Sequence, residues 1–151
     1  MIRKAGLHDV KAIHALVAEH AGEGRILGRA LSEIYGQLRD FTVAEDPESG
    51  AVLGCGALHF VWEDIAEIRS LAVTGASQGK GLGTGIIEAL LDEGREAGVK
   101  RVFVLTYRPP IFERLDFRII KKSLLPHKIW ADCIRCTKFP ECDEIALERN
   151  L

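Results

Sequence analysis

The chain has 151 residues, which is enough for one domain with a hydrophobic core that needs no disulfides or metals. A formal charge of -2 at pH 7 excludes the strongly basic surface of a typical nucleic-acid-binding domain. No apolar run reaches the roughly 18 residues of a membrane span, and the N-terminus lacks the apolar segment of a secretory signal. We therefore expect one cytoplasmic domain over residues 1–151 that binds neither nucleic acid nor membrane.

The N-terminal half predicts two helices and four strands. Apolar residues at helical spacing follow Asp9, a candidate helix cap, and the pattern breaks at Gly22. The alternating stretches after it are joined by turn residues such as Asp46-Pro47-Glu48-Ser49-Gly50, which predicts an antiparallel meander. The expected helices lie within residues 10–21 and 31–38, and the expected strands at 2–4, 41–45, 51–60 and 67–73.

The histidines and the cysteine of this half are assigned structural places. His8, His14 and His20 accompany the first helix, and none has a partner at a metal-ligand spacing. Each is therefore expected to be a solvated or capping side chain. Cys55 stands in an apolar strand, where a small buried thiol is expected, and the glycines on either side of it indicate a close backbone approach or a bulge.

The run Gln78-Gly79-Lys80-Gly81-Leu82-Gly83-Thr84 organises the chain, because it joins the strand at 67–73 to a long helical pattern. Backbone N–H groups at the positive end of a helix bind anions, and glycine lets an anion approach them and permits φ > 0. A nucleotide P-loop would need Lys-Ser/Thr after its last glycine, and a dinucleotide loop would need Gly-x-Gly-x-x-Gly. The pattern that remains is Gln78-x-x-Gly81-x-Gly83.

The C-terminal half continues with the helix that starts at this loop and ends at Gly98, with Ile86, Leu90 and their apolar neighbours on its buried face. A continuous apolar run at 102–105 is typical of a buried strand paired in parallel. Later elements are a helix at 109–115, strands at 117–120 and 145–147, and an irregular excursion at 126–143.

The pattern Gln78-x-x-Gly81-x-Gly83 after an apolar strand resembles the pyrophosphate-binding motif of the GNAT acetyltransferases, and the order of elements matches that family through the whole core. The resemblance implies an α/β (α+β) GNAT fold. Its sheet would be mixed and mostly antiparallel, with a splayed central strand pair, and helices would flank it. It also implies acetyl-CoA as cosubstrate, with the pantetheine arm paired to exposed backbone groups of the splayed strand. The residues that carry over to the cofactor are Leu71, Ala72, Val73, Gln78, Gly79, Lys80, Gly81, Leu82, Gly83 and Thr84.

Glu67 stands where GNAT enzymes often place a carboxylate that takes the proton of the acceptor amine, directly or through water. Attack on a thioester needs a neutral amine, so this proton must leave. The alternative is a strand-edge carboxylate paired with Arg69 or Lys100. His59, one strand earlier, is the reserve base because imidazole titrates close to neutral pH.

One position departs from the family. Many GNAT enzymes protonate the leaving thiolate with a tyrosine in a Tyr-x-x-x-Gly-Phe pattern, but here Phe112 and Asp116 replace the tyrosine and the glycine. Phe112 cannot donate a proton, so the thiolate leaves unassisted, or Tyr107 or water serves as the acid.

The order of several short motifs is similar to that in the acetyltransferase domains of N-acetylglutamate synthases, which implies transfer to the α-amino group of glutamate in arginine biosynthesis. Arginine binds carboxylates through two parallel hydrogen bonds, so Arg29 and Arg108 are the candidate substrate anchors, with Arg25 and Arg69 behind them. Glutamine, another small amine or a protein N-terminus remain alternative acceptors, and a non-catalytic acyl-CoA sensor is the rival from another class. The motifs are Gly24-x-Ile26-Leu27-x-Arg29, Gly54-Cys55-Gly56-Ala57-Leu58, Ala66-Glu67, Val104-Leu105-Thr106-x-Arg108, Phe112-Glu113-Arg114 and Phe117.

The excursion at 126–143 holds Cys133, Cys136 and Cys142, with His127 and Asp132 nearby. A structural zinc is one interpretation. It would need a fourth ligand, and the cysteine spacing matches no common zinc finger, so no metal is predicted. Reduced thiols or a disulfide are the alternatives. The segment could also close over the acceptor site or pack against a second subunit, since GNAT domains commonly form homodimers.

Overall fold

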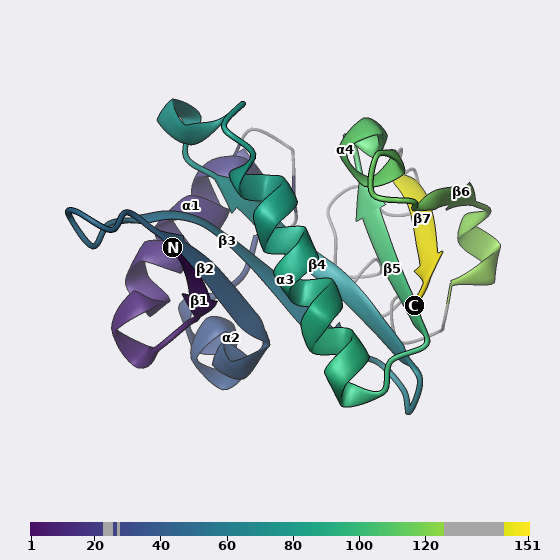
Figure 1. Ribbon diagram of the computed structural model, residues 1–151. Coiled ribbons are helices and arrows are strands. Elements are labelled where there is room, and N and C mark those ends of the chain that lie inside the picture. The colour runs from purple at the N-terminus through teal and green to yellow at the C-terminus, as the bar shows by residue number, and fades with distance from the viewer. Residues whose placement is uncertain (23–25, 27, 126–143) are drawn as a thin grey trace.

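The computed structural model describes residues 1–22, 26, 28–125 and 144–151. The elements follow the predicted order, with short 3-10 turns between several of them (Figure 1). They are β1 (Ile2–Lys4), α1 (Val10–Gly22), α2 (Leu31–Gly36), β2 (Phe41–Glu45), β3 (Val52–Phe60), β4 (Ile65–Val73), α3 (Leu82–Ala97), β5 (Arg101–Thr106), α4 (Pro109–Glu113), β6 (Arg118–Ile120) and β7 (Ile145–Asn150).

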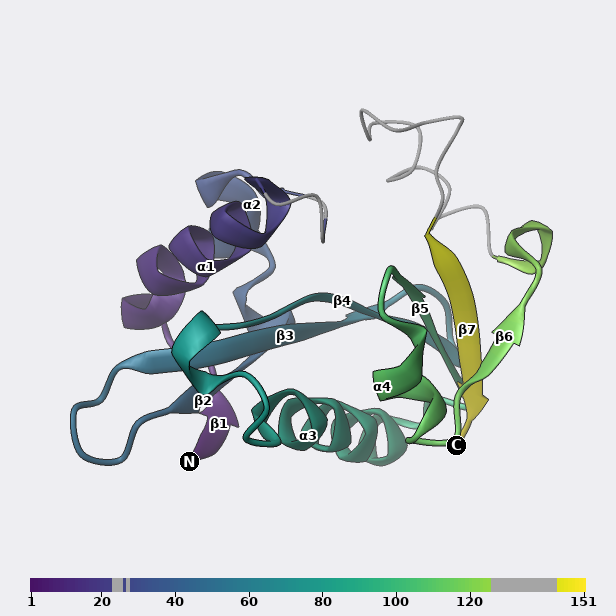
Figure 2. The same ribbon diagram turned by 90° about the horizontal axis from the view of Figure 1, so that it is seen from above.

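The described strands form one mixed sheet in the order β1-β2-β3-β4-β5-β7-β6. β1 to β4 pair antiparallel, which confirms the predicted meander, and the predicted parallel pair is β4 with β5. Figure 2 shows α1 and α2 on one face of the sheet and α3 and α4 on the other. Each face carries its own hydrophobic cluster, so the two sets of helices are held independently.

β4 and β5 separate halfway along their length, as the family resemblance implied. They are paired from Ile65 with Arg101 to Ile68 with Val104, and beyond this point no pairing joins them. β5 continues to pair with β7 as far as Thr106. In Figure 1 the two strands diverge toward the edge where α3 begins and α4 lies. The result is a wedge at the centre of the sheet.

A bulge at Ser70 changes which residues of β4 face which helices. Ser70 has φ 57°, a left-handed conformation that is uncommon for a residue other than glycine, and the register of β3 with β4 shifts between Cys55 and Ala57. Before the bulge, Ile68 packs against α3, while Arg69 lies on the α1 face; after it, Ala72 packs on the α1 side. The bulge therefore aims the second half of β4 into the wedge.

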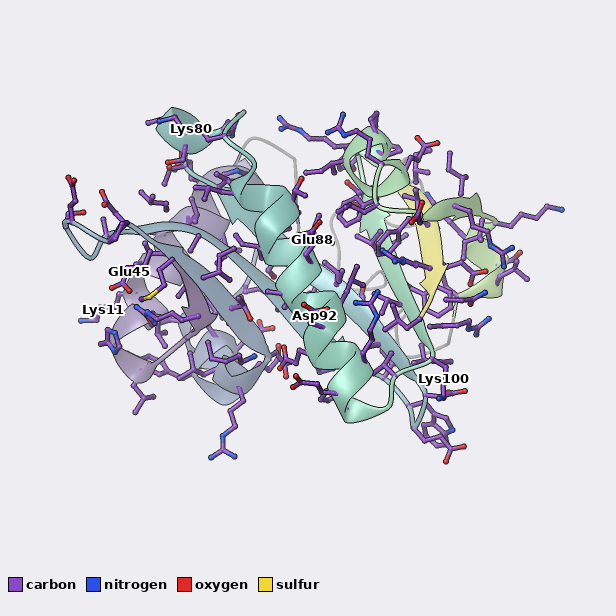
Figure 3. The ribbon with its side chains drawn as sticks, viewed as in Figure 1. Lys11, Glu45, Lys80, Glu88, Asp92 and Lys100 are labelled. Carbon is purple, nitrogen blue, oxygen red and sulfur yellow. The ribbon has the colours of Figure 1, made fainter. Side chains whose placement is uncertain are left out.

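α3 lies close against β3 because two glycines leave room for it. A β-carbon built at Gly56 would lie 2.8 Å from Cγ2 of Ile86, and one built at Gly54 would lie 3.0 Å from Cδ1 of the same residue. This confirms the predicted close approach beside Cys55. The predicted polar side of α3 is exposed, as Glu88 and Asp92 show in Figure 3.

Three predictions need correction. Asp9 precedes α1 without capping it: its carboxylate accepts a hydrogen bond from the Gly6 N–H at 2.7 Å and binds Arg3 through both oxygens. His20 is buried instead of solvated. The last strand was expected at residues 145–147, but β7 extends to Asn150 and lies between β5 and β6. Local pattern could not reveal this length, because long-range pairing with β5 is what sustains the strand.

Candidate active site

A cavity of about 340 Å³ occupies the wedge between β4 and β5. Residues from both faces of the sheet line it: His20, Ile26 and Arg69 from the α1 side, and Leu82 and Phe112 from the α3 side. The cavity therefore joins the two faces. A long flexible substrate could enter from one face and meet a second substrate that enters from the other.

The glycine loop forms one end of this cavity, and its backbone is arranged to bind an anion. Gly79 and Gly81 have φ 79° and 80°, which side chains with a β-carbon rarely adopt. The first hydrogen bond of α3 runs from the Gly85 N–H to the Gly81 carbonyl. Within the described residues, no hydrogen bond uses the six consecutive N–H groups from Gly79 to Thr84. Such a cluster at a helix N-terminus fits a diphosphate.

The second half of β4 offers a matching strip of backbone. Leu71, Ala72 and Val73 line the cavity, and their edge toward β5 has no strand partner because the pairing ends at Ile68. Unpaired N–H and C=O groups can bind the amides of an extended chain. The predicted pantetheine strip and the predicted pyrophosphate loop thus lie along one cavity, and the residues fit coenzyme A.

Nine of the ten predicted cofactor residues line the cavity, and Lys80 does not. Lys80 is exposed and lies on the outer side of the loop (Figure 3). Its contribution remains a prediction. The sequence interpretation missed Ser77, a buried polar residue of the turn between β4 and the loop that also lines the cavity.

A buried ion pair lies at the α1 side of the wedge. Oε1 of Glu67 is 3.5 Å from Nη1 of Arg69, and Arg69 donates a hydrogen bond from Nη2 to Oε1 of Gln37 at 3.1 Å. Arg69 lines the cavity, whereas Glu67 is buried and does not line it. The alternative pairing of Glu67 with Arg69 is thus present in the structure. To act as the base, Glu67 would need either a water that links its carboxylate to the substrate or a movement of Arg69 away from it.

The two predicted carboxylate anchors differ in position. Arg108 is exposed, lines the cavity and precedes Pro109-Pro110 at the start of α4, as predicted. The side chain of Arg29 is 7% exposed, with Nη1 at 3.7 Å from Oε2 of Glu33, and it is not among the lining residues. Arg69, ranked behind them on sequence grounds, is therefore better placed for substrate than Arg29. Arg25 lies outside the described residues.

Two histidines face the α1 side. His59, the reserve base, is the cross-strand neighbour of Glu67, but its Nδ1 is 2.7 Å from Oδ2 of Asp40 and it does not line the cavity. His20 does line it, from the last turn of α1. Nδ1 of His20 lies 3.1 Å from the carbonyl oxygen of Leu16.

Phe112 occupies the position of the missing tyrosine and is a core residue. It is buried and packs edge-to-face against Phe117, with ring centroids 5.3 Å apart. Thr106, the last residue of β5, and Tyr107 after it line the cavity, and both carry hydroxyl groups. Thr106 accepts a hydrogen bond at Oγ1 from the Arg108 N–H at 2.9 Å, so its own hydrogen can be donated elsewhere.

The cysteine predictions separate into two groups. Cys55 is fully buried, as expected, and burial raises the pKa of its thiol to about 12, so it is not a nucleophile at neutral pH. Cys133, Cys136 and Cys142 lie outside the described residues. In the described part of the chain, no group of three or more His, Cys, Asp or Glu side chains could hold a metal ion. The described helices include none long and apolar enough to span a bilayer.

A splayed strand pair, with a glycine loop at the end where the strands separate, is typical of acyl-CoA-dependent transferases. The chain belongs to the acetyltransferase (GNAT) family, whose family model matches residues 18–110. It is an acyltransferase that uses acetyl-CoA, since solved relatives with the same fold contain coenzyme A. The rival of a non-catalytic sensor is thereby set aside.

Particular relatives narrow the comparison. The chain is 41% identical to an uncharacterized N-acetyltransferase of Chlorobaculum tepidum, over 99% of this chain and 96% of the relative. It is 38% identical to an amino-acid acetyltransferase of Mycobacterium tuberculosis, over 89% of this chain and 78% of the relative.

Two solved structures share the fold over all of this chain. One is Rv2747 of M. tuberculosis in complex with CoA and the ligand NLQ, with a TM-score of 0.86, 32% identity and 99% of that chain covered. The other is N-acetylglutamate synthase of Neisseria gonorrhoeae with coenzyme A and N-acetyl-glutamate, with a TM-score of 0.87 and 26% identity. The chain spans 35% of this longer synthase.

Proposed function

We propose that the protein transfers acetyl from acetyl-CoA to the α-amino group of L-glutamate, the first step of arginine biosynthesis. The single observation that carries the proposal is the cavity in the wedge, because the glycine loop, Arg69 and Arg108 all line it. An amino acid needs cations for its α-carboxylate, and a guanidinium binds it through two parallel hydrogen bonds. The amino-acid acetyltransferases among the relatives support the same acceptor class.

The proposed reaction is direct attack within a ternary complex. Acetyl-CoA supplies the thioester. The chain's own groups bind the diphosphate at residues 79–84, hold the pantetheine arm along β4, and orient the amino acid through Arg69 and Arg108. Holding both reactants in one wedge removes most of the entropic barrier to their encounter.

Protons must also move, because an ammonium group loses two protons when it becomes an amide. Glu67 is the proposed acceptor of the first, through a water that passes Arg69. The thiolate regains one proton, and Thr106 and Tyr107 provide hydroxyl groups at the end of β5 that could donate it. The feature that supports Glu67 is its burial beside the wedge on the acceptor face.

The test is coenzyme A release from acetyl-CoA across a panel of amino acids and polyamines, for the wild type, Arg108→Ala and the control Arg95→Ala. Arg95 is partly exposed on α3 and pairs with Asp92, far along the helix from the glycine loop. We expect glutamate-dependent turnover that falls about 10-fold to 100-fold in Arg108→Ala, since a charge-assisted pair contributes about 1.5–3 kcal/mol. Arg95→Ala should match the wild type.

Turnover with glutamine or a polyamine, but not with glutamate, would keep the transfer reaction and reject the assigned acceptor. Unchanged turnover in Arg108→Ala would reject Arg108 as the anchor and leave Arg69 in that role. Absence of turnover with every amino acid, together with tight binding of acetyl-CoA, would overturn the amino-acid assignment.

A further inference from the structure

His20 is a cavity-lining residue to which the proposed reaction gives no role. It lies in the last turn of α1, on the face of the sheet that also carries α2 (Figure 2), and it is only 6% exposed. Buried polar side chains normally have hydrogen-bond partners for each of their polar atoms. The two nitrogens of this ring differ in this respect.

The hydrogen bond of Nδ1 determines what Nε2 can do. A carbonyl oxygen only accepts, so Nδ1 must carry a hydrogen to bond with the oxygen of Leu16, 3.1 Å away. The neutral ring is then held in the tautomer that has a lone pair on Nε2. No hydrogen bond joins Nε2 to another described residue. A largely buried residue that lines the cavity thus carries a hydrogen-bond acceptor.

The charged side chains that line the same cavity indicate what this acceptor would bind. Arg69 and Arg108, which line the same cavity, can only donate hydrogen bonds and suit carboxylate oxygens. An α-amino acid carries a carboxylate and an amino group on one carbon. The carboxylate fits the guanidinium groups, and the amino group, a donor, needs an acceptor. Among the described lining side chains, the imidazole of His20 is the one that offers a nitrogen lone pair.

We propose that His20 binds the acceptor amino acid: Nε2 accepts a hydrogen bond from the amino group that attacks the thioester. The contact holds that nitrogen in place, and no covalent bond forms or breaks at His20. The inference rests on the proposed function, because it requires an amino-acid acceptor, and it adds the residue that recognises the acceptor's nucleophilic end.

Three variants test this contact: His20→Leu, His20→Gln and the control His14→Leu. Leucine fills a similar space, favours helix and removes the acceptor atom, whereas glutamine restores an acceptor oxygen. His14 lies on the same helix but does not line the cavity. Steady-state kinetics are measured with each substrate varied in turn.

We expect His20→Leu to lower kcat/KM for the amino acid about 10-fold to 100-fold, mainly through KM, because one hydrogen bond to a charged group is lost. The KM for acetyl-CoA should stay within about twofold, a split that a merely structural role would not produce. His20→Gln should recover part of the loss, and His14→Leu should match the wild type. An unchanged kcat/KM in a folded His20→Leu protein, or an equal loss of acetyl-CoA binding, would overturn the contact.

A second measurement does not depend on turnover. The ¹⁵N resonance of Nε2 in His20 is recorded in the wild type with coenzyme A bound while the amino acid is added. We expect it to shift on saturation, and a resonance that does not move overturns the contact even if the enzyme is active. A wild type without turnover on any amino acid overturns the proposed function and the contact with it, so the two failures are distinguishable.

Discussion

The proposed cofactor site and the proposed acceptor site differ in the groups that build them. The groups proposed to bind the cofactor are backbone groups, namely the N–H cluster from Gly79 to Thr84 and the open edge of β4. The proposed acceptor site is instead built from side chains that line the cavity, among them His20 and Arg69, on the face of the sheet that carries α1 and α2 (Figure 2). A backbone site is specified by glycines and a helix start within one segment. A side-chain site combines residues that are far apart in sequence.

This difference has a consequence for specificity. The backbone site can bind the same cofactor with many side-chain sequences, since its ligands are N–H and C=O groups that every residue has. In the proposed acceptor site, single substitutions at His20, Arg69 or Arg108 should change the substrate while the cofactor remains bound. Substitutions in one site should therefore leave binding at the other site unchanged.

The largest effect is expected at Glu67. Glu67→Gln keeps the size of the side chain but removes the proton acceptor, so kcat should fall about 10²-fold to 10⁴-fold, while the KM for acetyl-CoA stays unchanged. Single-turnover kinetics measure the chemical step directly. Glu148→Gln is the control: this carboxylate is also buried and arginine-paired, through Arg118 at 2.7 Å, but it lies away from the cavity. Equal losses in both variants would mean that Glu67 is a structural ion-pair residue.

A smaller effect, on acetyl-CoA binding alone, is expected at Gly81 in the glycine loop. Its φ of 80° is strained for a β-branched residue, although a β-carbon there would meet no atom within 4 Å. Gly81→Val should therefore weaken acetyl-CoA binding about 10-fold to 100-fold by displacing the N–H groups, with the fold retained. Titration calorimetry measures the affinity. Gly75→Ala, also in open space but without positive φ, should bind normally. Normal binding by Gly81→Val would reject the backbone site.

At Asp9, just before α1, we expect a change in stability and the smallest effect on catalysis. Arg3 holds the pKa of the Asp9 carboxyl below its usual value of 3.8, through hydrogen bonds at 2.7 and 3.0 Å. A lowered pKa stabilises the folded state above about pH 4, and this contribution is lost as the pH falls through the lower folded-state value. Asp9→Asn should therefore lower the free energy of unfolding by about 1–3 kcal/mol at pH 7.

Urea unfolding from pH 7 down to pH 2 measures this difference. The gap between wild type and Asp9→Asn should shrink as the pH falls below about 4. The exposed control Asp92→Asn, which removes a surface pair on α3, should change the free energy of unfolding by less than about 1 kcal/mol. A gap that is independent of pH would mean that Asp9 acts through packing and not through its charge.

The sequence by itself determined the elements and the cofactor half. Strands β2 and β3, helix α3 and the glycine loop follow from local rules of hydrophobic period, turn residues and positive φ, and nine of the ten predicted cofactor residues line the cavity. The chemistry of that half lies in one continuous segment, so neighbours in the sequence are neighbours in the site. Two positions, Asp9 before α1 and His20 in its last turn, could not be judged in this way, because their patterns are equally typical of the surface.

Only the tertiary structure decided the acceptor half. The bulge at Ser70 and the separation of β4 from β5 set which side chains reach the wedge. Arg69 lines the cavity whereas the buried Glu67 does not, and the packing of α1 brings in His20 from about fifty residues earlier in the chain. Arg29, which the motif favoured, lies instead beside Glu33. Burial and proximity of side chains depend on how distant segments pack, and no local spacing contains that information.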